Sequence, residues 1–301
     1  MSDIKLFRLG TEVEELPGSS VAVEKALQSL LEQHLETFLG VRFLASEYST
    51  GKTHGGRIDT LGIDENNSPV IIEYKRSTNQ NVINQGLYYL DWLLDHQADF
   101  ELLTRKRLGE DVADKVDWSA PRLVCIAGGF TKYDEHAVRL INRNLELLRY
   151  RSYDGFLVLE LVNATSGSAV AVGTREGEKG KQTDETVRER YEEGTQALRD
   201  LFDALDAHLT ALGDDVTRET LKHYFAYRRI KNLASVVLRP QSQELLVYLK
   251  VNPDDVTLED GFTRDVRTIG HLGTGELEVR IGSTADIERA RPLIEQSYDA
   301  S

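Results

Sequence analysis

The segment GRIDTLGIDENNSPVIIEYKR, residues 56–76, decides how the first half of this sequence folds. Two runs of strand-forming residues, 57–64 and 69–76, flank the polar stretch DENNSP, which is typical of a hairpin turn. A third strand is predicted immediately upstream, at 42–48. These three strands are therefore expected to form an antiparallel meander.

On that hairpin, three side chains with complementary chemistry are predicted to meet on one face. Side chains alternate between the faces of a strand, so Glu73 and Lys75 point the same way, and pairing brings Asp59 beside them. Two adjacent carboxylates repel each other unless a cation lies between them, and oxygen ligands suit Mg²⁺. The lysine would orient a water molecule or stabilise charge on a phosphate. This pattern indicates metal-dependent phosphodiester hydrolysis, and an ordinary Glu-Lys ion pair on a surface hairpin is the alternative.

Around the hairpin, the sequence predicts an α/β domain over residues 1–163. Apolar residues recur at helical spacing before and after the meander, and a short apolar run ending in two glycines is typical of a buried strand. The expected helices are 21–39, 80–96, 100–108 and 134–148, and the further strands are 122–127 and 155–161. This order of elements predicts a mixed sheet covered by helices.

The second half of the chain is predicted to form a separate small α+β domain over residues 187–301. Residues 164–186 are rich in Gly, Ser, Thr and charge without periodicity, which is typical of an interdomain linker. The expected elements of the second domain are helices 186–212 and 283–298 and strands 232–238, 244–251 and 276–282.

Composition limits the function classes. The 301 residues include 36 Lys and Arg against 50 Asp and Glu, a formal net charge of −14, so contact with nucleic acid would need a local basic patch. No apolar run approaches the roughly 20 residues that span a bilayer, and the first residues lack the apolar core of a signal peptide. One cysteine excludes an intrachain disulfide. We therefore expect a cytoplasmic protein without a membrane partner.

The residues of the hairpin resemble the PD-(D/E)XK nuclease motif. In this sequence, thirteen residues separate Asp59 from Glu73-Tyr74-Lys75, and both parts lie on predicted hairpin strands. The resemblance implies a restriction-endonuclease-like αβββαβ core that hydrolyses phosphodiester bonds with Mg²⁺ or Mn²⁺. It also implies that Asp59, Glu73 and the backbone carbonyl of Tyr74 hold the metal, while Lys75 serves the attacking water.

A second part of this resemblance lies on the helix after the motif. Gln85 and Tyr89 are four residues apart and share one helix face. They resemble the Gln-x-x-x-Tyr element of RecB-like members, which implies that Gln85 supports the catalytic site and that Tyr89 contacts nucleic acid. A tyrosine packed in the core with a glutamine at the surface is the alternative.

A third part lies on the first helix, which in many such nucleases contributes a glutamate. The run Val-Glu-Lys-Ala-Leu-Gln from residue 23, like the Gly-Arg-Ile-Asp segment, is similar to EndoMS-like mismatch endonucleases. The resemblance implies that Glu24 is a further catalytic and metal-binding residue. Glu32 and Glu36 are the competing candidates, Glu32 being the second choice.

The whole chain also resembles a bacterial two-domain family whose C-terminal domain has no known function and which is often labelled "predicted transport protein". The segments that carry this resemblance are KHYFAYR at 222–228, NLA at 232–234, HLGTG at 271–275 and LIEQSY at 293–298. The sequence has no membrane span that would support transport, so that label is set aside.

Basic and aromatic residues alternate near the first of these segments. Basic groups neutralise phosphates and aromatic rings stack on bases, so this region is the predicted contact surface for nucleic acid or a nucleotide. An ordinary amphipathic element is the alternative, and His271 with Gly273 and Gly275 is a weaker candidate for a ligand loop. The predicted contact residues are Lys222, Tyr227, Arg228, Arg229 and Lys231.

Together these features predict a metal-dependent endo- or exonuclease that acts on DNA, in repair or in defence against foreign DNA. Its second domain would select the substrate or bind a partner. The alternative function is a nuclease-fold module without catalysis that binds nucleic acid, a nucleotide or a partner protein, the last through its acidic surface. A homodimer is compatible with either function.

Overall fold

The computed structural model describes residues 4–10, 13–19, 24–75, 82–167 and 186–301. The chain divides into two compact units. The first contains Met1–Ile63, Pro69–Asp114 and Arg122–Thr165, and the second contains Asp64–Ser68, Lys115–Pro121 and Ser166–Ser301. Most of the predicted linker, residues 168–185, lies outside the described residues, as do parts of the predicted helices 21–39 and 80–96.

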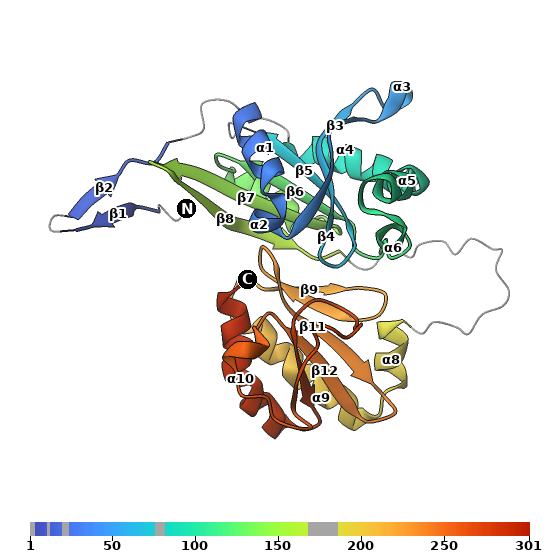
Figure 1. The fold of residues 1–301 in the computed structure, drawn as a ribbon. Helices are drawn as coiled ribbons and strands as arrows, with labels where there is room; N and C mark the ends of the chain where they lie inside the picture. Colours follow the sequence, from blue (N-terminus) through green and yellow to red (C-terminus); the bar gives the residue numbers. More distant parts are fainter. Residues whose placement is uncertain (1–3, 11–12, 20–23, 76–81, 168–185) are drawn as a thin grey trace. The chain divides into compact units, whose positions relative to one another are not determined.

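The first unit is built on a six-stranded mixed sheet, as predicted (Figure 1). The β4–β5 and β7–β8 pairs are antiparallel, whereas β5–β6 and β6–β7 are parallel. The strands, in their order across the sheet, are β3 (Val41–Ser49), β4 (Arg57–Asp64), β5 (Pro69–Lys75), β6 (Arg122–Ala127), β7 (Asn144–Tyr153) and β8 (Phe156–Thr165). The predicted meander therefore occupies one half of the sheet and carries the motif residues.

Helices pack against this sheet through apolar stripes. Leu27 and Leu31 of α1 are buried, and the buried side of α4 contacts β5 and β6. The predicted helix 21–39 is divided at His34, and Gly40 ends it in the left-handed conformation, as expected for a helix C-terminus. The helices are α1 (Glu24–Gln33), α2 (Leu35–Leu39), α3 (Gly51–His54), α4 (Val82–Asp95), α5 (Gln97–Leu108), α6 (Glu110–Ala113) and α7 (Lys132–Val138).

One local prediction for this unit was wrong, and one pair of strands was not predicted. The unpredicted strands are β1 (Leu6–Leu9) and β2 (Val13–Leu16), which pair in antiparallel fashion. The predicted helix 134–148 ends at Val138, because residues from Asn144 onward form β7. Leu, Glu and Arg favour helix locally, but here they lie between β6 and β8, and burial in the sheet outweighs a propensity of a few tenths of a kcal/mol per residue.

The second unit is an α+β domain with an antiparallel six-stranded sheet, which confirms the predicted class. Its predicted first helix is divided at Gly194, and the Thr195 side chain caps the second part. Strands β9, β10 and β13 were not predicted. Across the sheet the strands are β13 (Thr263–Asp265), β14 (Leu277–Ile281), β12 (Glu244–Leu249), β11 (Asn232–Arg239), β10 (Phe225–Arg228) and β9 (Thr217–Thr220), and the helices are α8 (Val187–Glu193), α9 (Gln196–Thr210), η1 (Pro253–Asp255) and α10 (Thr284–Asp299).

The two faces of this second sheet have different partners. Leu245, Val247 and Leu249 of β12 share one buried cluster with residues of α9 and α10. Leu246 and Tyr248, which alternate with them, belong to a smaller cluster on the opposite face. The C-terminal sheet thus has one face covered by helices and a second face that is partly apolar.

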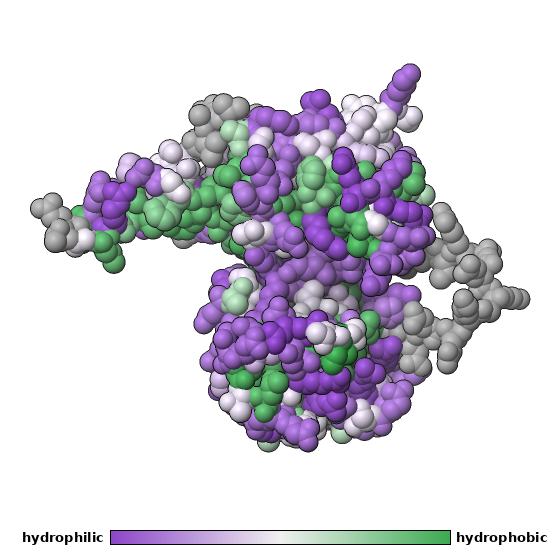
Figure 2. Space-filling view, in the orientation of Figure 1, coloured by the Kyte–Doolittle hydropathy of each residue, from purple (hydrophilic) through white to green (hydrophobic). Residues whose placement is uncertain are grey.

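The visible surface of the second unit is mainly hydrophilic (Figure 2). Within the first unit, an apolar band lies over β7 and β8 in the same view. None of the described helices has the length and apolar character needed to cross a bilayer.

Candidate active site

Two carboxylates lie at the end of the β4–β5 ladder. The Asp59 amide donates a hydrogen bond to Glu73 Oε1 (3.1 Å), and the Tyr74 amide donates one to Asp59 Oδ2 (3.0 Å). Each carboxylate is thus held by the backbone of the opposite strand. The structure brings Asp59 and Glu73 together as the hairpin register predicted, and strand pairing positions both.

The second oxygen of Glu73 has no hydrogen-bond partner within the described residues. Glu73 is 0% exposed, and its Oε2 atom is buried without a partner. Burial, reinforced by the charge of Asp59, raises the pKa of Glu73 to about 8. Burial also raises the pKa of Asp59. A pair of this kind ionises fully only when a positive charge joins it.

Lys75 supplies one positive charge beside the pair. It follows Glu73 by two residues on β5, so both side chains project from the same face. The positive charge of Lys75 acts to lower the pKa of both Asp59 and Glu73. Lys75 Nζ also lies 3.5 Å from Glu24 Oε1, at the start of α1. Its side chain is only 15% exposed, so this charge is focused on the carboxylates rather than dispersed in solvent.

The three first-helix glutamates have separate positions. Glu24 contacts Lys75, whereas Glu32 Oε1 accepts hydrogen bonds from Thr60 Oγ1 (2.6 Å) and Gln28 Nε2 (2.9 Å). Glu36 is exposed on α2. Glu24 is therefore the candidate that lies beside the site, and it does so through the lysine.

Sequence reasoning missed Glu47, which lies on β3. Its carboxylate pairs with Lys25 Nζ (2.8 Å) and Arg57 Nε (2.5 Å), and the hydrogen bond from Lys25 lowers the pKa of Glu47. Its charge contributes to the raised pKa of Asp59. Among the described residues, no three His, Cys, Asp or Glu side chains gather closely enough to hold a metal ion by themselves.

Gln85 and Tyr89 lie together, as their spacing predicted. Gln85 Nε2 donates to Tyr89 Oη (3.1 Å), and that oxygen also accepts from the Arg57 amide (3.2 Å) at the start of β4. Tyr89 is buried, and a Cβ atom on Gly56 would lie only 2.5 Å from its ring. The pair therefore holds the strand that carries Asp59. Contact of Tyr89 with nucleic acid remains a prediction.

In the second unit, two predicted contact residues lie inside the domain. Tyr227 is 0% exposed, and its hydroxyl donates to Asp206 Oδ1 (2.6 Å). Arg228 is 2% exposed and lies 3.6 Å from Glu219 Oε1. Their burial does not fit the predicted contact surface. Basic and aromatic residues alternate here because successive side chains of strand β10 point to opposite faces of the sheet.

The other three predicted contact residues are more accessible. Arg229 pairs with Asp215 through Nε (2.7 Å) and packs over the ring of Tyr298. Lys222 is exposed and Lys231 is half-buried. For these residues, binding of nucleic acid remains a prediction.

Comparison with known proteins gives matches to both parts of the chain. A family model described as a domain of unknown function, DUF5655, matches residues 186–301. An uncharacterized protein of Haemophilus influenzae is 27% identical over 296 residues, which are 95% of this chain and 96% of that protein.

Two solved structures resemble part of the chain. One is a repair endonuclease from Pyrococcus abyssi, with 16% identity and a TM-score of 0.29 over 44% of this chain and 49% of that one. The other is an EndoMS-dsDNA2 complex, with 17% identity and a TM-score of 0.25 over 44% and 47%. The match spans about half the length of each nuclease, so the function proposed below depends on the residues of this chain.

Proposed function

We propose that the first unit is a metal-dependent nuclease that hydrolyses phosphodiester bonds in DNA. One observation carries the proposal: Asp59 and Glu73 meet at the end of a hairpin with Glu73 Oε2 buried and without a partner among the described residues. An unpaired buried carboxylate costs several kcal/mol, which a purely structural role would not offset. A divalent cation offsets that cost directly.

The residues present fit Mg²⁺ or Mn²⁺. Mg²⁺ prefers oxygen ligands, and it is commonly bound through one or two carboxylates, with water and substrate phosphate completing the shell. Asp59, Glu73 and the Tyr74 carbonyl would hold it. Such a metal supplies Lewis-acid stabilisation of charge on the phosphate. A site with two carboxylates rather than three leaves positions for a substrate.

Lys75 has the position for a role in attack on the phosphate. Its ammonium group lies on the same strand face as Glu73 and is mostly shielded from solvent. In that position it would orient the attacking water and stabilise negative charge on the phosphate. Glu24, 3.5 Å from Nζ, would hold the lysine in place, so we assign Glu24 a positioning role.

The test is cleavage of a panel of labelled substrates: single-stranded, duplex, mismatched, branched and modified DNA, and RNA. The wild type is compared with Lys75→Ala in Mg²⁺, in Mn²⁺ and in EDTA. Lys106→Ala is the matched control, because Lys106 is an exposed lysine on α5, and neither a hydrogen bond nor an ion pair joins it to any described residue.

Cutting that needs metal, survives in Lys106→Ala and is lost in Lys75→Ala would support the proposal. Asp59→Asn should behave like Lys75→Ala. Equal cutting by the wild type and both site variants would refute the assignment, since contaminating nuclease would then account for the activity. No cutting by folded protein on any substrate would favour the non-catalytic binding module.

A further inference from the structure

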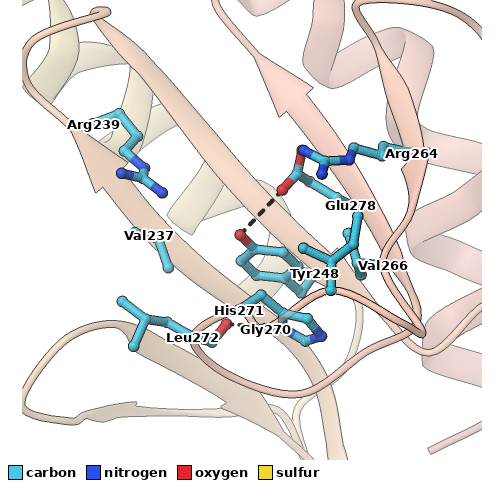
Figure 3. Close-up of a pocket in the computed structure, with 10 residues that line it drawn as sticks. Val237, Arg239, Tyr248, Arg264, Val266, Gly270, His271, Leu272 and Glu278 are labelled. Carbon is cyan, nitrogen blue, oxygen red and sulfur yellow. Dashed lines mark hydrogen bonds between the residues drawn. The ribbon is translucent and has the colours of Figure 1, made fainter.

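The second unit contains a pocket on the face of its sheet opposite α9 and α10 (Figure 3). Its volume of about 450 Å³ lies in the range of small-molecule sites. Apolar side chains form much of its wall, and three arginine or histidine side chains and one glutamate provide its polar groups. The lining includes Val237, Arg239, Tyr248, Arg264, His271 and Glu278.

An aromatic pair forms the centre of this pocket. The rings of Tyr248 and His271 are stacked, with centroids 4.6 Å apart and planes inclined by 15°. Tyr248 is 3% exposed, and its hydroxyl donates to Glu278 Oε2 (3.2 Å). His271 is partly exposed, and one face of its imidazole ring covers Tyr248.

The loop that carries His271 is built to lie close to the sheet. Gly273 has a φ of +81°, and a Cβ atom there would lie 2.4 Å from Cβ of Ser235. Gly275 has a φ of +128°, and its Cβ would meet the Leu249 backbone at 2.6 Å. The Thr274 amide also donates to Ser235 Oγ (3.0 Å). Both glycines therefore let the backbone approach β11 and β12, which fixes the imidazole over the pocket.

Two arginines flank the aromatic pair. Figure 3 shows Arg239 and Arg264 on opposite sides of Tyr248. Both are exposed, and neither makes a hydrogen bond or ion pair with any residue that the structure describes. The lining carboxylate, Glu278, already accepts from Tyr248 and lies 3.4 Å from Arg280 Nε. The pocket therefore has a surplus of positive charge in a chain whose net charge is −14.

We propose that this pocket binds a nucleotide through a phosphate monoester and a base. Guanidinium groups form strong charge-assisted bonds to phosphate oxygens, and the two arginines would share the phosphate. The base would stack on His271, beside the apolar wall formed by Val237 and Val266. The ligand has two sources, a free nucleoside monophosphate or the 5′-phosphorylated end of a strand. Binding at this pocket does not depend on the nuclease chemistry proposed for the first unit.

The experiment is calorimetric titration of the full chain in EDTA, so that cleavage does not interfere. The probes are the four nucleoside 5′-monophosphates, the matching nucleosides, inorganic phosphate, and a short oligonucleotide with and without a 5′-phosphate. Arg239→Ala, Arg264→Ala and His271→Ala are compared with Arg291→Ala. Arg291 is the matched control because it lies on α10 and pairs with Glu288 away from the pocket.

We expect at least one phosphorylated probe to bind, with affinity reduced about tenfold by each pocket arginine removed and unchanged in Arg291→Ala. His271→Ala should weaken the binding of nucleotides but not the binding of inorganic phosphate. Preference for monophosphates identifies the free ligand, and preference for the phosphorylated oligonucleotide identifies a strand end. Equal affinity for inorganic phosphate and nucleotides, or no binding of any probe, would overturn the proposal. Binding of nucleotides at this pocket, together with no cutting of any substrate in the cleavage panel, would refute only the nuclease assignment.

Discussion

Glu73→Gln should make the metal-free protein more stable at alkaline pH, because the wild type must ionise a buried carboxyl group. The pKa of Glu73 is raised from 4.5 to about 8, chiefly by burial. The folded state therefore keeps a proton that the unfolded state releases. Stability is complete below pH 4.5, falls as the pH rises towards 8, and is constant above it. At 1.36 kcal/mol per pKa unit, the wild type loses about 4–5 kcal/mol across this window.

The glutamine variant keeps the shape of the side chain and removes that titration. Its free energy of unfolding, from urea unfolding in EDTA followed by tryptophan fluorescence, should rise relative to the wild type by about 4 kcal/mol between pH 5 and 9. Trp92 of α4 is a buried reporter in the same unit. The same substitution should abolish the stabilisation that Mg²⁺ gives to the wild type.

The control is Glu146→Gln, which alters another buried carboxylate in the same sheet. Glu146 pairs with buried Arg122, with Nε–Oε1 and Nη2–Oε2 distances of 2.9 and 3.0 Å. Replacing this carboxylate by an amide should destabilise the protein at every pH, because the buried guanidinium of Arg122 then loses the negative charge that faces it. If Glu73→Gln were also destabilising throughout, or left the pH dependence unchanged, the inference of an uncompensated carboxylate at Glu73 would be wrong.

Three further outcomes follow from the same contacts. Mg²⁺ should raise the melting temperature of the wild type but not of Asp59→Asn, as measured by differential scanning calorimetry, and an equal rise in both would contradict metal binding at this pair. Arg122→Met should lower the free energy of unfolding, measured in urea, by about 3–5 kcal/mol. Most of this loss should be recovered when Glu146 is also replaced by an apolar residue. Gly56→Ala should place a methyl group against the Tyr89 ring, destabilise the unit by about 1–3 kcal/mol and slow cleavage, whereas unchanged thermal unfolding and cleavage rate would show that the ring moves aside freely.

The motif hairpin was predictable because its signals are local. Two short runs of strand-forming residues joined by a polar turn make β4 and β5 a hairpin, and its register, with Thr60 opposite Ile72, continues to Asp59 opposite Glu73. The four-residue spacing of Gln85 and Tyr89 likewise determines that they share a helix face. In these cases, the geometry of a single hairpin or a single helix sets the distance between the side chains.

Other features depend on neighbours that are distant in sequence. Helix propensity favoured a helix through residues 144–148, but their place between β6 and β8 made them a strand. Sequence spacing likewise could not show which of Glu24 and Glu32 lies beside the site, because both are on α1. Only the packing of that helix brings Glu24 to Lys75. Tertiary packing decided these points.

The sequence by itself determined the class of each domain, the pairing of Asp59 with Glu73 and the position of Lys75 on the same strand as Glu73, because strand periodicity and turn chemistry act over a few residues. Only the tertiary structure decided that Tyr227 and Arg228 are buried. It alone also brought Arg239, from β11, to the same pocket as His271. Burial and the meeting of charges depend on which strands become neighbours, and that choice is made by the packing of the whole domain.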